Sequence, residues 1–281
     1  MKTLRKWMDR HMVIGILLLL AGNMILMTIA ESITTWLVSE LPVIFCILPG
    51  IVTALVILFI FDRFYKTEFL GCVRGGRPKE GIAPAGIMLI YYVFIMLQTL
   101  ITGKLGAPTA ASVGMAVMAG AVEESIFRGV LVSYMLKIRR EQKDIVSVLI
   151  ISAVLFGLAH SMNIFMGAAV GITVMQVLGT IGMGALFAAA YIRSGNIIIS
   201  MVIHGLTDFL CFLDVSAVGE GGIMIEKVTV WSFADVALCA ALFGLALYLV
   251  RPAKREEICA MWHSKWNKDC KAEIKAEINK A

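Results

Sequence analysis

The sequence predicts an all-α protein, a polytopic membrane helix bundle of about eight transmembrane helices with both termini in the cytoplasm. The first observation is composition: of 281 residues, 59% are apolar and only 16% are charged, and the mean hydropathy is +0.87. These values exclude a disordered chain and are untypical of a soluble domain. The second is that apolar runs long enough to cross a bilayer recur along the chain. The third is that basic residues cluster in alternate connections between these runs.

The spanning helices are expected at eight apolar runs, of which the fifth is short and the sixth is long. They are 12–30, 41–61, 83–103, 111–136, 145–160, 165–192, 196–213 and 229–250. The first run follows a basic start, as a signal peptide would. It is longer than the usual apolar region of a signal peptide and further spans follow it, so we expect a retained helix. The chain then divides into a cytoplasmic N-terminus at 1–11, a transmembrane bundle at 12–250 and a cytoplasmic amphipathic tail at 251–281.

The positive charges predict which side of the membrane each connection occupies. Of the 25 Lys and Arg residues, 22 fall before residue 12, within 62–82 and 137–144, at Arg193, and after residue 250. The opposite connections hold only Lys104 and Lys227. Because basic segments stay in the cytoplasm, both termini are expected there, and an even number of spans gives the same result. The net charge of +5 is explained by this topology and does not indicate a nucleic-acid partner.

The tail carries an apolar stripe of its own. Ile258, Trp262 and Trp266 recur at every fourth position among lysines. This spacing is typical of an amphipathic helix that lies on the inner leaflet of the membrane, so the lipid bilayer is the partner expected for this segment.

Three charged residues stand inside the fourth apolar run, in the stretch AGAVEESIFRGV. An ionised Glu or Arg near the middle of a bilayer costs about 2.5–3.5 kcal/mol, so such residues are paired or functional. Glu124 and Arg128 are four residues apart with the acid first, which is the favourable order for an ion pair along a helix. Glu123 points in a different direction, on the face of Phe127, and is left without a partner in its own helix.

Candidate partners for Glu123 come from two other runs. His160 lies in VLFGLAHSMN and His204 in ISMVIHGLTDFL, and Asp208 follows His204 by one helical turn on the same face. A rise of about 1.5 Å per residue, counted from the cytoplasmic ends, places all four side chains at a similar depth within the bilayer. We therefore expect Glu123, His160, His204 and Asp208 to converge.

Two kinds of chemistry suit this set of side chains, and both are forms of amide hydrolysis. In one, Glu123 is a general base that takes a proton from water, His160 shares that proton or holds the water, and His204 and Asp208 stabilise the oxyanion. In the other, His160, His204 and Asp208 are ligands of zinc or another divalent metal, and Glu123 is the base. The H-E-x-x-H motif, a Ser or Cys triad context and a Gly-rich phosphate loop are absent, and the six cysteines show no C-x-x-C spacing.

The same residues carry a family resemblance. EESIFR resembles an E-E-x-x-x-R motif, FGLAH, which begins at Phe156, resembles F-x-x-x-H, and HGLTD resembles H-x-x-x-N/D. In this order on membrane helices, the three motifs resemble the CAAX-protease and bacteriocin-processing (Abi-type) family of intramembrane proteases, which includes the prenyl-protein endopeptidases. The resemblance covers roughly residues 110–212.

The resemblance implies an intramembrane endopeptidase in the cell membrane, with an eight-helix core and a cavity that faces the cytoplasm. It makes Glu123 the catalytic glutamate and His160 its partner in water activation. It makes His204 and Asp208 the oxyanion or metal-site pair. The residues with a supporting role are Glu124, Arg128, Phe127 and Phe156. The implied substrate is a peptide or protein at the membrane, with or without a lipid group.

One position departs from the prenyl-protein endopeptidases, where Asn is usual in place of Asp208. Asn donates a hydrogen bond to an oxyanion and an ionised Asp does not. Asp208 is therefore protonated, orients His204 or binds metal. Two other functions stay open: a non-catalytic bacteriocin-immunity or scaffold member of the same family, and a proton-coupled transporter. A transporter predicts internal repeats and paired broken helices, which the sequence does not show.

Overall fold

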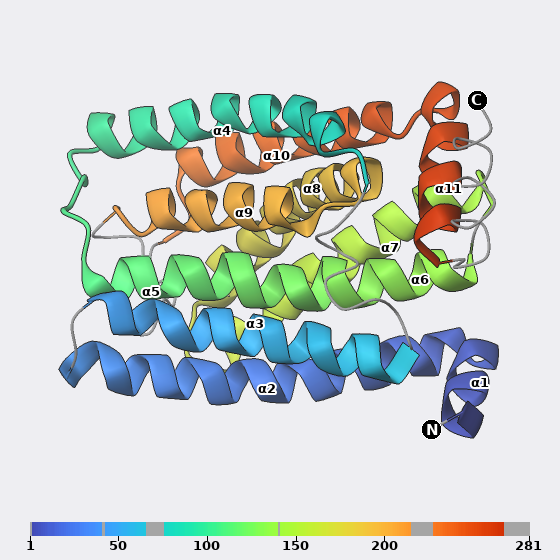
Figure 1. Ribbon diagram of the computed structural model, residues 1–281. Coiled ribbons are helices and arrows are strands. Elements are labelled where there is room, and N and C mark those ends of the chain that lie inside the picture. The colour runs from blue at the N-terminus through green and yellow to red at the C-terminus, as the bar shows by residue number, and fades with distance from the viewer. Residues whose placement is uncertain (1, 41–42, 66–75, 140, 215–226, 267–281) are drawn as a thin grey trace.

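The computed structural model describes residues 2–40, 43–65, 76–139, 141–214 and 227–266. Over these residues the chain is a bundle of helices, most of which run side by side along one direction (Figure 1). The only β pairing within the described ranges is an isolated bridge between Leu105 and Asp214. The predicted all-α fold class is confirmed.

The long helices account for most of the expected apolar runs. They are α2 (Met12–Glu40), α3 (Val43–Tyr65), α4 (Ile82–Ile101), α7 (Asp144–Ala159), α8 (Val170–Ser194), α9 (Ile197–Cys211) and α10 (Val230–Leu249). A further helical rod consists of α5 (Ala110–Met118), the π-helical turns η2 (Ala119–Glu123) and η3 (Ser125–Val132), and α6 (Ser133–Ile138). The short elements are α1 (Lys2–Arg10), α11 (Pro252–Trp266) and the 3₁₀ turns η1 (Pro78–Gly81) and η4 (His160–Ile164).

Six helical segments within the described residues are long and apolar enough to cross a membrane, so the chain is a multi-pass membrane protein. They are Met12–Ile29, Ile47–Phe64, Pro78–Ile101, Asp144–Ile164, Val170–Ser194 and Val230–Leu249. The run expected at 111–136 is the rod that π-helical turns interrupt, and the run expected at 196–213 is the shorter apolar helix α9. The count of eight crossings stays a prediction.

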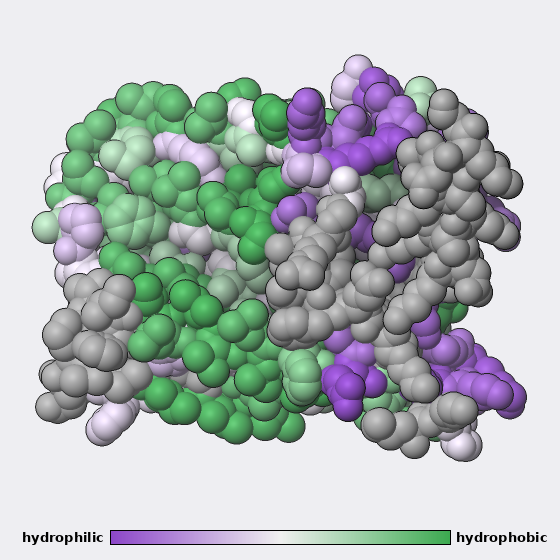
Figure 2. All heavy atoms as spheres, in the orientation of Figure 1, coloured by the Kyte–Doolittle hydropathy of each residue, from purple (hydrophilic) through white to green (hydrophobic). Residues whose placement is uncertain are grey.

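The two ends of the described chain lie on the same side of the bundle. Figure 1 places α1 and α11 at one end, as an even number of crossings requires. Hydrophilic residues gather at this end of the face drawn in Figure 2, and apolar residues cover most of the rest. The cytoplasmic location of this end stays a prediction, and it agrees with the distribution of basic residues.

The helix α8 forms the centre of the bundle and packs against α7, α9 and α10. Its second half is closed to solvent, since every residue from Gly184 to Ser194 is buried. Small residues dominate this half, with Ala185, Ala188, Ala189 and Ala190 all fully buried. Small side chains let neighbouring helices approach closely, which is how membrane bundles bring polar groups together.

The helix α11 packs on the bundle more than the sequence predicted. Ile258 and Trp262 are buried, and Trp262 Nε1 donates a hydrogen bond of 2.8 Å to the carbonyl of Ile192. The Trp262 ring also meets the ring of Tyr191 edge to face, at 5.2 Å between centroids. This part of the apolar stripe therefore faces protein, where a lipid surface was expected, and the side chain of Trp266 lies outside the described residues.

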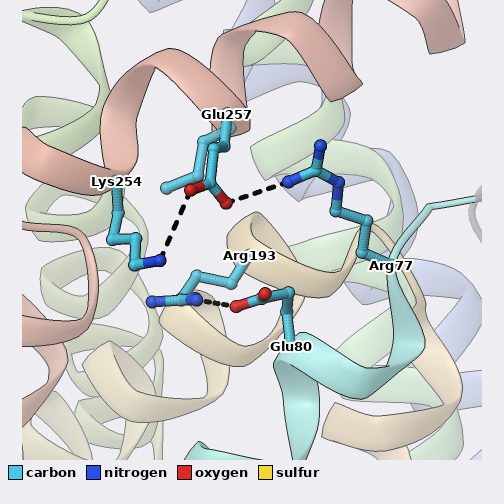
Figure 3. A pocket seen from close by; sticks show the side chains of 6 residues that line it. Arg77, Glu80, Arg193, Lys254 and Glu257 are labelled. Carbon is cyan, nitrogen blue, oxygen red and sulfur yellow. Dashed lines mark hydrogen bonds and ion pairs between the residues drawn. The ribbon is translucent and has the colours of Figure 1, made fainter.

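A cluster of charges joins α11 to two segments far from it in sequence. Figure 3 shows Arg77 and Lys254 on either side of Glu257, and Arg193 paired with Glu80. Arg77 Nη1 lies 2.9 Å from Glu257 Oε2, and Lys254 Nζ lies 3.4 Å from Glu257 Oε1. Arg193 also donates to the carbonyl of Leu249 at 2.9 Å, at the end of α10. The cluster connects the ends of α4, α8, α10 and α11.

The two halves of this cluster are expected to differ in their effect on stability. Arg77 and Glu257 are about half exposed, whereas Arg193 is only 9% exposed. Arg77→Ala should lower the free energy of unfolding by less than about 1 kcal/mol, as for other exposed pairs. Arg193→Ala leaves the Leu249 carbonyl without its donor and should cost about 1–3 kcal/mol. Denaturant unfolding in detergent measures both, and equal losses would contradict the assignment.

Candidate active site

Glu123 stands in π-helical backbone and Glu124 lies between two π-helical turns, where the sequence predicted a regular helix. The turns η2 and η3 flank Glu124, and Glu123 is the last residue of η2. A π-helical turn is wider than an α-helical one because its hydrogen bonds connect residues five apart, and it occurs frequently at functional sites. The local backbone thus departs from the α-helix at the residues singled out for chemistry.

The predicted ion pair between Glu124 and Arg128 is present and sealed from solvent. Glu124 Oε1 lies 2.9 Å from Arg128 Nη1, and both side chains are 0% exposed. Arg128 Nη2 donates to the carbonyl of Gly184 in α8 at 2.8 Å. The guanidinium carbon stands 4.5 Å from the centroid of the Phe156 ring, a cation–π contact from α7. The pair therefore ties η3 to α7 and α8.

The imidazole of His204 lies among three carboxylates. Its Nδ1 is 2.9 Å from Glu124 Oε1. On the other side of the ring, Nε2 is 3.9 Å from Glu123 Oε2 and 3.7 Å from Asp208 Oδ1. The sequence predicted that Glu123 and Glu124 point in different directions. In the folded chain both approach the same ring, one at each nitrogen.

The partner at Nδ1 determines which nitrogen of His204 carries a proton. The charge of Arg128 keeps Glu124 ionised, and an ionised carboxylate only accepts hydrogen bonds. The Nδ1 atom of His204 is therefore the donor, an assignment made from the hydrogen-bond network. A carboxylate that holds Nδ1–H and thereby orients the ring is a common arrangement for a working histidine.

His160 is near the site but does not bond to Glu123. Its Nδ1 lies 3.0 Å from the carbonyl of Phe156, one turn back in α7. The Phe156 ring contacts both histidine rings, with centroids 5.0 Å from His160 and 5.4 Å from His204. Among the described residues, no hydrogen bond or ion pair connects His160 to Glu123. The predicted convergence thus holds closely for Glu123, His204 and Asp208, and His160 adjoins them through Phe156.

Aromatic rings hold the histidines in place. Phe127 meets Phe156 edge to face at 5.1 Å between centroids, and the supporting role of both phenylalanines stays a prediction. Phe187 of α8 stacks on His204 at 4.9 Å between centroids. The sequence did not single out Phe187, because one aromatic residue in a run of small residues has no signal that separates it from ordinary packing.

The exposed fractions divide the site into a closed side and an open side. Glu124 is 0% exposed and His204 is 4% exposed, whereas Glu123 is 15% and Asp208 is 29% exposed. Glu123 and Asp208 thus keep part of their surface uncovered by protein, whereas the Glu124–Arg128 pair is completely covered. This division supports a reacting role for Glu123 and a supporting role for Glu124.

The side chains do not form a ready metal site. Within the part of the chain that the structure describes, no three His, Cys, Asp or Glu side chains are grouped so that they could hold a metal ion. His204 Nδ1 is bonded to Glu124 and His160 Nδ1 to a backbone carbonyl, which leaves Nε2 of each ring as the atom that a metal would use. In the described residues His160, His204 and Asp208 are not grouped closely enough to hold a metal, and metal dependence stays a hypothesis.

A fourth intramembrane acid was missed by the sequence analysis. Asp235 in α10 accepts a hydrogen bond of 2.7 Å from the hydroxyl of Tyr91 in α4. The sequence feature that could have identified Asp235 is that it is a single acidic residue within the last apolar run, 229–250. The bond joins α4 to α10, and hydrogen bonds of this kind stabilise membrane bundles by about 0.6–2 kcal/mol.

Comparison with known proteins agrees with the motifs. Residues 105–210 match a family model described as type II CAAX prenyl endopeptidase Rce1-like. The matched segment contains all the residues of the candidate site and nearly coincides with the predicted core at 110–212. No curated protein and no solved structure matches the chain.

Proposed function

We propose that this chain, which matches the type II CAAX prenyl endopeptidase Rce1-like family model over residues 105–210, is an intramembrane endopeptidase of that family. It hydrolyses a peptide bond near the cytoplasmic face of the membrane. The observation that carries the proposal is the buried imidazole of His204, held at Nδ1 by Glu124 and open at Nε2 toward Glu123 and Asp208. Packing alone does not require three acids around one histidine.

In the proposed reaction Glu123 is the general base. Its carboxylate takes a proton from water, and the water oxygen attacks the carbonyl carbon of the peptide. The resulting tetrahedral intermediate collapses, the C–N bond breaks, and the proton on Glu123 passes to the leaving amine. General base catalysis of this kind contributes about 10²–10⁴-fold to a rate. The partial exposure of Glu123 supports this role, because the water and the peptide must reach it.

His160 and His204 have different tasks in this proposal. The bond from His160 Nδ1 to the Phe156 carbonyl leaves Nε2 free to accept a hydrogen bond from the attacking water. His204 Nε2 stands farther from Glu123 and Asp208 than a hydrogen bond allows. A protonated His204 can therefore donate Nε2–H to the oxyanion, and donors aimed at developing charge are a major source of catalysis.

Asp208 orients His204 in this account. An ionised Asp has no proton to donate to an oxyanion, in contrast to the Asn usual at this position in the prenyl-protein endopeptidases. Its distance of 3.7 Å from His204 Nε2 supports an electrostatic role beside the ring. Asp208→Asn should therefore retain cleavage, since Asn also contacts the ring and can donate to the oxyanion directly.

The test is cleavage by the purified protein in liposomes. A peptide library that includes C-terminally prenylated and unmodified members would be incubated with the protein, and products read by mass spectrometry. We expect at least one peptide to be cut. Preference for prenylated peptides would assign a lipidated substrate, and loss of cleavage with a chelator would assign a metal. Saturable binding of peptides without any cut would show a non-catalytic binding member of the family and contradict the proposal.

A further inference from the structure

Two glycines meet where the rod that carries the glutamates crosses α9. A methyl group on Gly120 of η2 would lie 2.6 Å from the carbonyl oxygen of Met201 and 2.8 Å from the Cα of Gly205. A methyl group on Gly205 would lie 3.1 Å from the carbonyl oxygen of Ala116 and 3.6 Å from the Cα of Gly120. The two backbones are thus in direct contact, at a separation that leaves no room for a side chain on Gly120 and little room for one on Gly205.

This crossing lies next to the residues proposed to react. Gly120 precedes Glu123 by three residues, and Gly205 directly follows His204. The contact from Glu124 Oε1 to His204 Nδ1 spans the same two elements and is 2.9 Å long. A small increase in the spacing of the backbones would therefore lengthen that hydrogen bond and widen the gap between Glu123 and His204.

We propose that Gly120 and Gly205 are positioning residues, which set the distance between the glutamate pair and His204. Ordinary contact begins near 3.4 Å, so a methyl group on Gly120 requires a shift of roughly 0.8 Å, and one on Gly205 a smaller shift. Misplacement of a reacting group by 1 Å costs about 100-fold in rate. The expected loss of rate rests on the proposed function, whereas the expected change in the distance between Glu124 and His204 does not.

The experiment compares Gly120→Ala and Gly205→Ala with two matched controls. Gly244→Ala adds a methyl group in a membrane helix where nothing lies within 4 Å. Gly15→Ala adds one against the Tyr134 hydroxyl, a tight contact between α2 and α6 in which α9 takes no part. Gly244→Ala shows the effect of an added methyl group without a clash. Gly15→Ala shows the effect of a clash that lies away from the crossing of Gly120 and Gly205.

The first readout needs no substrate. In protein labelled with ¹⁵N-histidine, the Nδ1–H proton of His204 should give a downfield resonance, assigned by its loss in His204→Gln. Gly120→Ala should lose or shift this resonance, Gly205→Ala should shift it less, and both controls should keep it. An unchanged resonance in Gly120→Ala, with the protein folded, would overturn the inference, as would an equal loss in Gly15→Ala.

The second readout is kinetic and uses a peptide that the wild type cuts. Gly120→Ala should lower kcat by about 10–100-fold with a change in KM below about threefold, and Gly205→Ala should lower kcat less. A larger effect of Gly205→Ala, or an effect on KM alone, would contradict a positioning role. If the wild type cuts no peptide, the proposed function fails, and the resonance of His204 alone decides the inference.

Discussion

Glu123→Gln is expected to lower the rate of peptide cleavage by at least about 100-fold while the protein stays folded. Glutamine keeps the size of the side chain but has no carboxylate to take a proton from water. Loss of the carboxylate breaks no hydrogen bond or short ion pair among the described residues, because Glu123 Oε2 lies 3.9 Å from His204 Nε2. The rate would be measured on a peptide that the wild type cuts, with unfolding followed in parallel.

The matched control for this substitution is Glu256→Gln, on the exposed face of α11. It makes the same chemical change outside the site and should leave the rate unchanged. Because Glu124 bonds to His204, substitutions at Glu124 affect the site and do not serve as controls. A rate in Glu123→Gln within about threefold of the wild type would remove Glu123 from the mechanism.

Arg128→Met is expected to cause a larger loss of stability than either Arg193→Ala or Arg77→Ala. It removes Arg128 from the fully buried Glu124 carboxylate and leaves His204 Nδ1 as the remaining partner; breaking a buried ion pair in this way costs about 3–5 kcal/mol in free energy of unfolding. It also removes the donor to the Gly184 carbonyl and the cation over the Phe156 ring. Denaturant or thermal unfolding in detergent measures the loss.

The double variant Glu124→Gln with Arg128→Met tests the cause of that loss. It removes both charges together, so no buried carboxylate is left unpaired. Its stability should recover part of the loss seen in Arg128→Met alone. A double variant less stable than Arg128→Met would show that the ion pair is not the source of the effect. Cleavage should stay impaired in both variants, since Glu124 also orients His204.

The sequence predicted the features that depend on local spacing or composition. Long apolar runs separated by basic segments were enough for the fold class, because the bilayer permits few alternatives for a backbone within it. The pairing of Glu124 with Arg128 followed from their spacing of four residues, and persists within π-helical backbone. Asp208 beside His204 followed from the same rule within α9.

The features that the sequence did not predict depend on tertiary packing. The contact of Glu124 with His204 joins two segments 80 residues apart and depends on the close crossing at Gly120. The packing of Trp262 against α8 depends on a carbonyl at Ile192 that no sequence pattern marks. A hydrophobic stripe shows that a helix buries one face, but not whether lipid or protein covers it.

Cleavage in ¹⁸O-labelled water shows whether this protein hydrolyses a peptide bond with a water molecule that Glu123 activates. Wild type and Glu123→Gln would be incubated with the same peptide, and the masses of the products measured by mass spectrometry. We expect the wild type to add one ¹⁸O atom to the new C-terminal carboxyl group and the variant to form almost no product. Labelled product formed at the wild-type rate by Glu123→Gln, or a cleaved product that carries no ¹⁸O, would contradict this mechanism.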